Sequence, residues 1–150
     1  MNSPLIRKAI VFSMDKHKDQ KRDRTGYPYI VHPISVFSIV KKYKHSKNSE
    51  MLLCASLLHD VLEDTETTYM DLVIDYGKDI ADLVLEVTND PIEIQKLGKL
   101  EYTKNKMLHM TNYGLIIKLA DNLDNITDEP TLKQITRYLS VIDFIKVNRQ

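Results

Sequence analysis

Apolar residues recur at helical spacing along nearly the whole chain, and no segment alternates apolar and polar residues in the manner of a strand. The pattern starts early. Ser3 and Pro4 are typical of a helix N-cap and of the first helical position, and Leu5, Ile6 and Ala9 then fall on one side of that helix. The sequence therefore predicts an all-α fold.

A polar segment with one glycine and two prolines interrupts this pattern after the first helix. The stretch "RDRTGYPYIVHP", residues 22–33, predicts an extended loop rather than a strand. Pro33 can open a second helix that runs to about Tyr43. The polar stretch "KHSKNSE", residues 44–50, then predicts a connector.

The remaining helices are separated by glycine, proline and short polar connections. Ser49 can cap a third helix that carries the stretch "LLHDVLEDT", residues 57–65. A fourth helix is expected from near Thr67 to about Gly77, a residue type common just past a helix C-terminus. Further helices are expected at about 78–88, 95–112 and 113–126, and after Pro130. Together they predict one helical domain over residues 1–150.

The composition is that of an ordinary globular protein. Of the 150 residues, 43% are hydrophobic, and 21 basic residues balance 21 acidic ones. This zero net charge argues against a broad nucleic-acid surface, so we expect no nucleic-acid partner. The charges are nevertheless segregated, because "KHKDQKRDR" (16–24) is basic and residues 60–90 are rich in Asp and Glu. Such segregation predicts either a site that binds a cation beside an anion, or two solvated helix faces.

Cys54 is the only cysteine, which excludes an intramolecular disulfide and suits a reducing compartment. Within "MLLCASLL" (51–58) it has the spacing of a small core residue. The N-terminus lacks the apolar core of a signal peptide, and no apolar run reaches the roughly 18 residues that a membrane span needs. We therefore expect a cytoplasmic protein without a membrane partner.

The stretch 57–65 is unusual because it places His59, Asp60, Glu63 and Asp64 beside leucines, and this apolar context predicts that all four are buried. Burying ionisable groups is costly unless they are paired or bind a metal. Residues three or four apart lie on neighbouring helix faces, and the adjacent His59 and Asp60 could both reach one ion at the helix edge. A ligand set of imidazole and carboxylate suits Mn, Fe or Zn better than Ca or Mg.

A tight metal site needs more than two protein ligands, and two other residues are candidates. His32 precedes a proline in the loop, and Asp121 lies in the apolar stretch "IIKLADNLDN" (116–125). Taken singly, each has an ordinary explanation, as a loop histidine bound to the backbone or as a helix-capping aspartate. Their coincidence with His59 and Asp60 favours one metal site. The other histidines lie in polar segments without evident partners and are not expected to belong to it: His17, His45 and His109.

These residues also match a known family. The order His32, His59-Asp60, Asp121 resembles the H…HD…D pattern of the HD superfamily of metal-dependent phosphohydrolases. More narrowly, "TGYPYIVHP", "LLHDVLEDT" and "IKLADNLDN" are similar to the hydrolase domain of the RelA/SpoT-type enzymes that make and break (p)ppGpp, and to stand-alone small alarmone hydrolases. The resemblance covers roughly residues 5–145 in the same order, and it implies a single HD-domain helical bundle.

The resemblance implies a role for each matched residue. His32, His59, Asp60 and Asp121 would bind a divalent metal, for which we expect Mn²⁺. Such an ion lowers the pKa of bound water and polarises a phosphoryl group.

Catalytic residues and substrate contacts follow from the same resemblance. Glu63 and Asp64 match the acidic pair that orients or deprotonates the attacking water, so they are the expected catalytic residues. Basic groups must neutralise the pyrophosphate. The expected substrate contacts are Arg22 or Arg24 in the basic loop, Asn125, and, if the loop does not hold the phosphates, Lys118 or Lys99.

The chain departs from the family pattern in two places. Asn122 follows the last metal aspartate, where the family has Arg or Lys. Either Arg22 or Arg24 could be the arginine that the family places before its metal histidine. Because that arginine can stack on the base, these departures leave the base preference of the site open.

Three functions are consistent with the sequence. The first is an enzyme that removes the 3′-pyrophosphate of (p)ppGpp to leave GDP or GTP. The second keeps the metal but hydrolyses another nucleotide, such as a dNTP, a nucleoside monophosphate or NADPH. The third is a nucleotide-binding module without turnover, which would not need Glu63 and Asp64. In each case the partner is a small nucleotide, and a homo-oligomer is left open.

Overall fold

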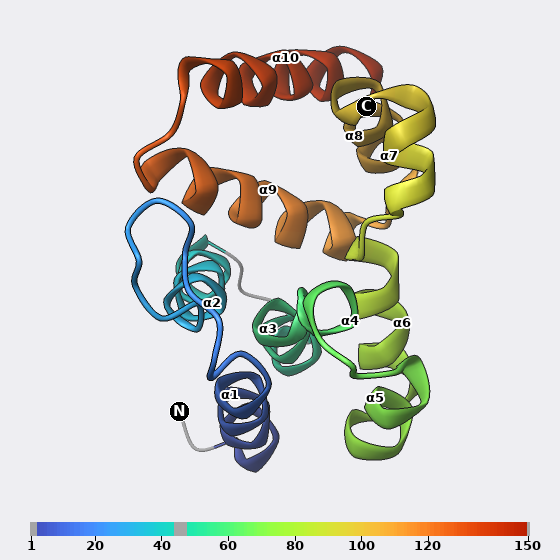
Figure 1. Ribbon diagram of the computed structural model, residues 1–150. Helices are drawn as coiled ribbons and strands as arrows, with labels where there is room; N and C mark the ends of the chain where they lie inside the picture. The colour runs from blue at the N-terminus through green and yellow to red at the C-terminus, as the bar shows by residue number, and fades with distance from the viewer. Residues whose placement is uncertain (1–2, 44–47, 150) are drawn as a thin grey trace.

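The computed structural model describes residues 3–43 and 48–149, which form helices joined by loops (Figure 1). The all-α prediction is confirmed, because the described residues form no strand and their one isolated antiparallel bridge, Lys21 to Pro28, lies in a loop. Nor is any helix in these ranges long and apolar enough to cross a membrane. The helices are α1 (Pro4–Lys16), α2 (Val31–Tyr43), α3 (Ser49–Leu58), α4 (Val61–Asp64), α5 (Tyr69–Tyr76), α6 (Lys78–Val87), α7 (Pro91–Leu97), α8 (Lys99–His109), α9 (Asn112–Thr127) and α10 (Leu132–Asn148).

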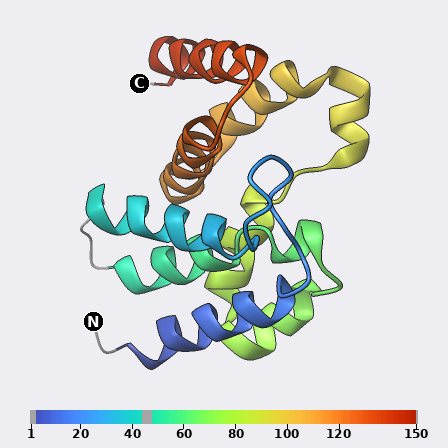
Figure 2. The same cartoon turned by 60° about the vertical axis from the view of Figure 1, so that its left-hand side comes forward.

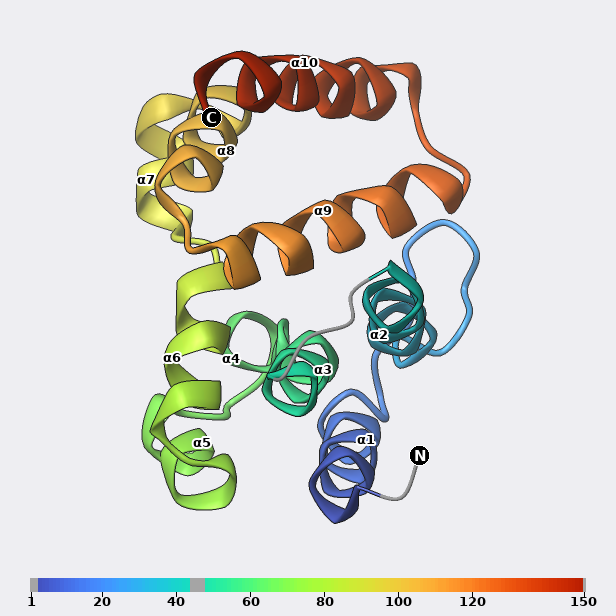
Figure 3. The ribbon, with the colours of Figure 1, turned by 180° about the vertical axis from the view of Figure 1, so that it is seen from behind.

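Helix α9 separates two groups of helices, as Figures 1 and 3 show. On one side, α3 packs against α1, α2 and α6, and α5 packs on α6. On the other side, α8 packs against α7 and α10. Because α9 contacts both groups, its two sides face different surroundings. Figure 2 shows the long loop between α1 and α2, which an ion pair between Arg22 and Asp128 joins to the C-terminal end of α9.

Helix α3 is the centre of the hydrophobic core. Leu57 and Leu58 are fully buried, and so is Cys54, as predicted for a small core residue. Burial and the charge of Glu50 raise the pKa of the Cys54 thiol to about 12, so the thiol is neutral at physiological pH. A helix that is apolar on every side must be surrounded, and α1, α2, α6 and α9 surround α3.

The early helix boundaries follow their capping residues. The Ser3 hydroxyl accepts the amide of Ile6 at 3.2 Å, which confirms the predicted N-cap of α1. Helix α2 begins at Val31, two residues before the predicted start at Pro33. A proline is tolerated in a first helical turn because that position needs no amide hydrogen bond. Residues 44–47 of the predicted connector lie outside the described residues.

The predicted third helix is wrong at the stretch 57–65, where two helices replace one. Helix α3 ends one residue before His59, and the single turn α4 begins one residue after Asp60. The Nδ1 atom of His59 lies 2.9 Å from the main-chain oxygen of Ser56, an acceptor that a continuous helix would use for the amide of Asp60. Both His59 and Asp60 nevertheless keep right-handed helical backbone angles across the break.

The predicted helix at 95–112 is also two helices. Helix α7 begins earlier, at Pro91, where the Asp90 side chain accepts two amides of the first turn. Gly98 then separates α7 from α8 with a φ of +80°, a conformation that L side chains rarely adopt. The helical spacing of apolar residues continues across this glycine, so the pattern alone did not indicate the break. The last helix, α10, follows Pro130 as predicted.

Candidate metal centre and its pocket

Three buried side chains from distant parts of the chain meet between α2, α3 and α9. His32 lies in the first turn of α2, His59 follows α3, and Asp121 lies within α9. The Nε2 atom of His32 lies 3.2 Å from Nε2 of His59 and 3.2 Å from Oδ1 of Asp121. One ligand atom of each residue lies within 4.8 Å of the other two, so a single metal ion could bind all three.

Asp60 adds a fourth donor to this group. Its Oδ2 atom lies 3.1 Å from Nε2 of His59 and 3.4 Å from Nε2 of His32. The same oxygen accepts the Tyr29 hydroxyl at 2.7 Å. The four residues expected to bind a metal are therefore neighbours. We refer to His32, His59, Asp60 and Asp121 as the metal cluster.

The chemistry of the metal cluster fits a divalent cation of the Mn, Fe or Zn class. Two imidazoles and two carboxylates are the mixed nitrogen and oxygen donors that these ions accept, whereas Ca²⁺ takes oxygen donors. All four residues are buried, with at most 8% of their surface exposed. Buried carboxylates require a positive partner, and a cation supplies one.

Protons compete with a cation for the metal cluster. Burial lowers the pKa of His32, but hydrogen bonds to three aspartates raise it to about 11. Burial alone would raise the pKa of Asp60, yet the charge of His59 and hydrogen bonds from both histidines hold it well below its usual value. Because a histidine must be neutral to bind a metal, a cation would take the place of the proton on His32.

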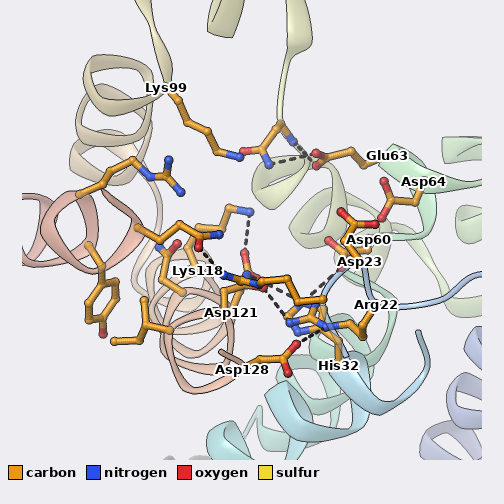
Figure 4. A pocket seen from close by; sticks show the side chains of 18 of the residues that line it. Arg22, Asp23, His32, Asp60, Glu63, Asp64, Lys99, Lys118, Asp121 and Asp128 are labelled. Atoms are coloured by element: carbon orange, nitrogen blue, oxygen red, sulfur yellow. Dashed lines mark hydrogen bonds and ion pairs between the residues drawn. The ribbon is translucent and has the colours of Figure 1, made fainter. Parts of the chain in front are cut away.

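A buried lysine lies beside the metal cluster. Lys118 precedes Asp121 by one turn of α9, and its Nζ atom lies 3.0 Å from Oδ2 of Asp121 (Figure 4). Burial lowers the pKa of this ammonium group, but the charges of Asp121 and Asp60 raise it above its usual value. Lys118 is therefore charged, and it also lines the pocket next to the cluster.

Glu63 and Asp64 are exposed, so the prediction that all four ionisable groups of this stretch are buried was wrong for this pair. They belong to α4, which restarts the helix after the break and places both residues in the pocket lining. The Glu63 carboxylate accepts the main-chain amide of Asn89 at 3.0 Å and its side-chain amide at 3.1 Å. Partial enclosure of its carboxylate and the charge of Asp60 raise the pKa of Asp64.

A pocket of about 920 Å³ opens above the metal cluster (Figure 4). Its lining comes from the loop before α2, from α4 and α9, and from α8 and α10 on the opposite side. The basic residues in this lining are Lys21, Arg22, Arg24, Lys99, Lys118 and Arg137. The walls also carry four carboxylates, those of Asp23, Glu63, Asp64 and Asp128. The pocket volume lies within the range of small-molecule sites, and a floor suited to a cation together with basic side chains suits an anion that both can bind.

The expected substrate contacts all line this pocket, and Arg22 is connected to the metal cluster. Arg22 donates from Nε to Asp128 at 2.8 Å and from Nη2 to Asn125 at 3.1 Å. Asn125 donates in turn to Oδ1 of Asp121 at 2.7 Å. The guanidinium carbon of Arg22 also lies 5.9 Å from the centre of the Tyr29 ring. One side-chain amide therefore links the basic loop to the metal cluster.

The far wall of the pocket, which we define by Arg24, Lys99, Arg137 and Tyr138, contains residues that no sequence motif indicated. Arg137 and Tyr138 come from α10, and Lys99, expected only as an alternative phosphate contact, comes from α8. Arg24 reaches this wall from the loop and donates to Gln134 of α10 at 2.5 Å. Arg137 and Tyr138 reach the pocket through the packing of α10 on α8 and α9, which the sequence does not specify locally.

Two further residues contact the metal cluster without having been expected. Tyr29 donates to Asp60, as described above, and Asp124 contacts the Nδ1 atom of His32 at 2.5 Å. A signal for Asp124 existed, because it follows Asp121 by three residues and so lies on a neighbouring face of the same helix.

His17 has partners, contrary to prediction. It is 1% exposed, its Nδ1 atom lies 2.7 Å from Oε1 of Gln20, and its ring centre lies 4.9 Å from that of Tyr29. The loop folds back over the end of α1, which the polar residues around His17 in the sequence did not indicate. His109 is exposed, bonds to the main chain of its own helix and is not part of the pocket lining. His45 lies outside the described residues.

Comparisons with known proteins identify relatives over most of the chain. The sequence model of the family described as HD domain matches residues 9–137. The guanosine-3′,5′-bis(diphosphate) 3′-pyrophosphohydrolase MESH1 of Xenopus tropicalis is 36% identical over 131 residues, which cover 85% of this chain and 70% of the relative. A probable guanosine-3′,5′-bis(diphosphate) 3′-pyrophosphohydrolase of Mycoplasma pneumoniae is 34% identical over 157 residues, which cover 97% of this chain but only 19% of the relative.

A solved structure shares the fold. It is described as "A metazoan ortholog of SpoT hydrolyzes ppGpp and plays a role in starvation responses", and it matches with a TM-score of 0.84 at 28% identity. The match covers 99% of this chain and 89% of that chain. The family model, the relatives and the fold agree, and the chain belongs to the HD domain family.

Proposed function

We propose that this protein is a metal-dependent phosphohydrolase that removes the 3′-pyrophosphate of (p)ppGpp and leaves GDP or GTP. The observation that carries this proposal is the buried metal cluster at the floor of a pocket whose lining includes six basic residues. The Xenopus tropicalis relative that is named for this reaction supports the same substrate, since the similarity covers 85% of the present chain.

The metal cluster would hold a divalent cation, for which we propose Mn²⁺. When bound, such an ion lowers the pKa of water and polarises a phosphoryl oxygen, so that hydrolysis can proceed near neutral pH. Tyr29 assists by donating to Asp60 and thereby orienting that carboxylate. His59 is oriented in the same way by the main-chain oxygen of Ser56.

Glu63 and Asp64 are the proposed acid–base residues. Figure 4 shows both on α4, with Asp64 beside Asp60 of the metal cluster. A carboxylate in this place can take the proton of the attacking water and return a proton to the leaving oxygen. The two hydrogen bonds from Asn89 restrict the rotation of Glu63. The raised pKa of Asp64 brings that group closer to the pH at which a proton donor is useful.

Basic residues of the pocket lining would hold the phosphate groups. Lys118 brings a positive charge to the side of the metal cluster, whereas Arg22 and Arg24 line the pocket from the loop. Asn125 is the proposed contact to the nucleoside. Phosphoryl transfer depends mainly on positioning and on neutralisation of charge, which these residues can supply without further covalent chemistry.

Another nucleotide is the second candidate substrate, because Asn122 leaves the base preference of the pocket open. This residue lines the pocket next to Asp121, where the family pattern has Arg or Lys, and its side-chain amide lies 3.8 Å from the sulfur of Met107. A neutral residue leaves one positive charge fewer for recognition of the substrate. The alternative substrates are a dNTP, a nucleoside monophosphate or NADPH. A nucleotide-binding module without turnover is the remaining alternative.

The test is a substrate screen with the purified protein. We expect ppGpp and pppGpp to yield pyrophosphate with GDP and GTP respectively, in the presence of Mn²⁺ and not with a chelator. The adenine analogue, dNTPs, nucleoside monophosphates and NADPH are assayed in parallel, with products separated by anion-exchange chromatography. The variant Asp60→Asn is the matched control, because the amide has the shape of the carboxylate but lacks its charge.

The outcomes separate the three functions. Activity confined to dNTPs, nucleoside monophosphates or NADPH, or cleavage at the 5′ phosphates, would contradict the alarmone reaction and favour the second candidate. Nucleotide binding without metal-dependent turnover would favour the binding module.

We also propose that the protein acts in the cytoplasm on a small nucleotide, without a nucleic-acid or membrane partner. The single buried cysteine, Cys54, and the zero net charge support this proposal. Fractionation of cells that express a tagged chain tests it, since recovery in the membrane or nucleoid fraction would contradict it.

A further inference from the structure

Asp124 lies behind the metal cluster rather than in the pocket. It is 9% exposed, lies on α9 one turn after Asp121, and is not among the residues that line the pocket. Its Oδ2 atom lies 2.5 Å from Nδ1 of His32, at the start of α2. A substrate in the pocket would therefore meet His32 from one side while Asp124 holds it from the other.

The two ring nitrogens of His32 have different surroundings. Nδ1 faces Asp124, whereas Nε2 faces Nε2 of His59 and Oδ1 of Asp121, each at 3.2 Å. A neutral imidazole offers a lone pair at Nε2 only when the proton is on Nδ1. A carboxylate accepts that proton in a hydrogen bond and cannot donate one back, so Asp124 selects the tautomer that a metal ligand requires.

The second histidine of the cluster is held differently. The Nδ1 atom of His59 lies 2.9 Å from the main-chain oxygen of Ser56, a neutral acceptor. A carboxylate makes an imidazole more basic than a carbonyl does, because a charge-assisted hydrogen bond polarises the ring more strongly. The two imidazoles are therefore unequal, and His32 is the one that a charged partner strengthens.

The charge of Asp124 is maintained by its neighbours. The Nη2 atom of Arg22 lies 3.8 Å from Oδ2 of Asp124. A guanidinium at this distance favours the carboxylate form of Asp124 over its neutral acid.

We propose that Asp124 is a positioning residue that holds His32 with Nε2 directed at the bound cation and strengthens that imidazole as a ligand. This inference rests on the metal site of the proposed function. Nothing in it depends on which nucleotide is hydrolysed, so it can be tested without a substrate.

The experiment measures the affinity of the protein for Mn²⁺ by equilibrium dialysis or calorimetry at neutral pH. We expect Asp124→Ala to bind Mn²⁺ about 10–100-fold more weakly than the wild type, the range found for loss of a hydrogen-bond partner of a ligand. Asp124→Asn should lose less, because its amide oxygen still accepts the Nδ1 proton but carries no charge. Being nearly isosteric, it also keeps the test decisive if Asp124→Ala does not fold.

Asp128→Asn is the matched control. Asp128 is the C-cap residue of α9, and its carboxylate pairs with Arg22 at 2.8 Å rather than with a histidine of the metal cluster. We expect its affinity for Mn²⁺ to equal that of the wild type. A purely structural role for Asp124 would lower the melting temperature in chelator but leave the Mn²⁺ affinity of the folded protein unchanged.

A spectroscopic measurement addresses the tautomer itself. Long-range proton–nitrogen spectra of the Zn²⁺-loaded protein should show His32 protonated at Nδ1 in the wild type. Equal Mn²⁺ affinity in the wild type and both Asp124 variants would overturn the inference while leaving the metal site in place. A wild-type protein that binds no Mn²⁺ would remove the metal site itself, and with it this role of Asp124.

Discussion

The floor and the far wall of the pocket hold their polar residues in different ways. The metal cluster on the floor is buried, and its side chains are fixed by bonds to one another and to Tyr29, Ser56 and Asp124. On the far wall, Arg24 and Lys99 are exposed, and Arg24 is held by one hydrogen bond that it donates to Gln134 of α10. The floor is therefore preorganised, whereas the wall must still be ordered when a ligand binds.

This difference predicts different consequences of mutation. Ordering a long exposed side chain on binding costs about 0.5–1.5 kcal/mol, which reduces what each wall residue contributes to affinity. A residue of the metal cluster is already ordered by folding, so it makes its full contribution without that cost. Substitutions on the floor should abolish turnover, and substitutions on the wall should change KM by graded amounts.

The largest effect is expected for Asp60→Asn on the floor. Loss of one anionic ligand should release Mn²⁺ and lower kcat/KM by more than about 10³-fold, since a bound metal contributes several kcal/mol and each 1.36 kcal/mol is a factor of ten. The Tyr29 hydroxyl can still donate to the amide oxygen, so the fold should persist. Steady-state kinetics and metal analysis check this. A variant that kept both metal and rate would remove Asp60 from the ligand set.

Glu63→Gln changes a residue of the pocket lining that belongs neither to the metal cluster nor to the far wall. We expect the rate to fall by about 10²–10⁴-fold with Mn²⁺ binding nearly intact, because Glu63 is proposed to move a proton rather than hold the metal. The matched control is Glu66→Gln, which changes an exposed glutamate outside the pocket lining and should leave kcat unchanged. If Glu63→Gln loses metal and its residual rate follows occupancy, Glu63 is a ligand instead.

The two loop arginines should differ in their effect on KM. Arg22 is half-buried and bonded to Asp128 and Asn125, so it is already positioned, and Arg22→Ala should raise KM about tenfold or more, since a hydrogen bond to a charged group contributes about 1.5–3 kcal/mol. Arg24 is exposed, and Arg24→Ala should raise KM less. Both changes should affect kcat less than KM.

Initial-rate measurements on both single variants and the double variant decide this point. Unchanged kinetics in all three would transfer phosphate binding to Lys118 or Lys99.

The smallest effect is expected at the N-cap of α10, the helix that carries Arg137 and Tyr138 of the far wall. Thr131 caps α10 in a capping box with Gln134, and Thr68 caps α5 in the same way far from the pocket lining. Replacing either threonine by Ala should cost about 1 kcal/mol and lower Tm by about 2–4 °C. Only Thr131→Ala should also raise KM, because α10 carries Arg137. Equal KM in both variants would show that the wall does not depend on the end of α10.

The sequence was informative wherever the relevant physics is local. Apolar spacing and capping residues predicted the all-α fold, the N-cap Ser3 and the buried Cys54, because helix periodicity and caps involve residues within a few positions of one another. The breaks at His59-Asp60 and Gly98 escaped this reasoning, since the apolar spacing continues across both. Nor did the polar residues around His17 indicate its contact with Gln20, which forms because the loop covers the end of α1.

In the candidate site too, some features follow from the sequence and others only from the tertiary structure. Sequence alone determined which residues are chemically suited to bind a metal, His32, His59, Asp60 and Asp121, because residue type and family pattern are properties of the chain. Only the tertiary structure decided that Asp124 stands behind His32, that Glu63 and Asp64 are exposed and that α10 supplies a wall of the pocket. These features arise from contacts between helices distant in sequence, and such contacts depend on how whole helices pack rather than on any short stretch of residues.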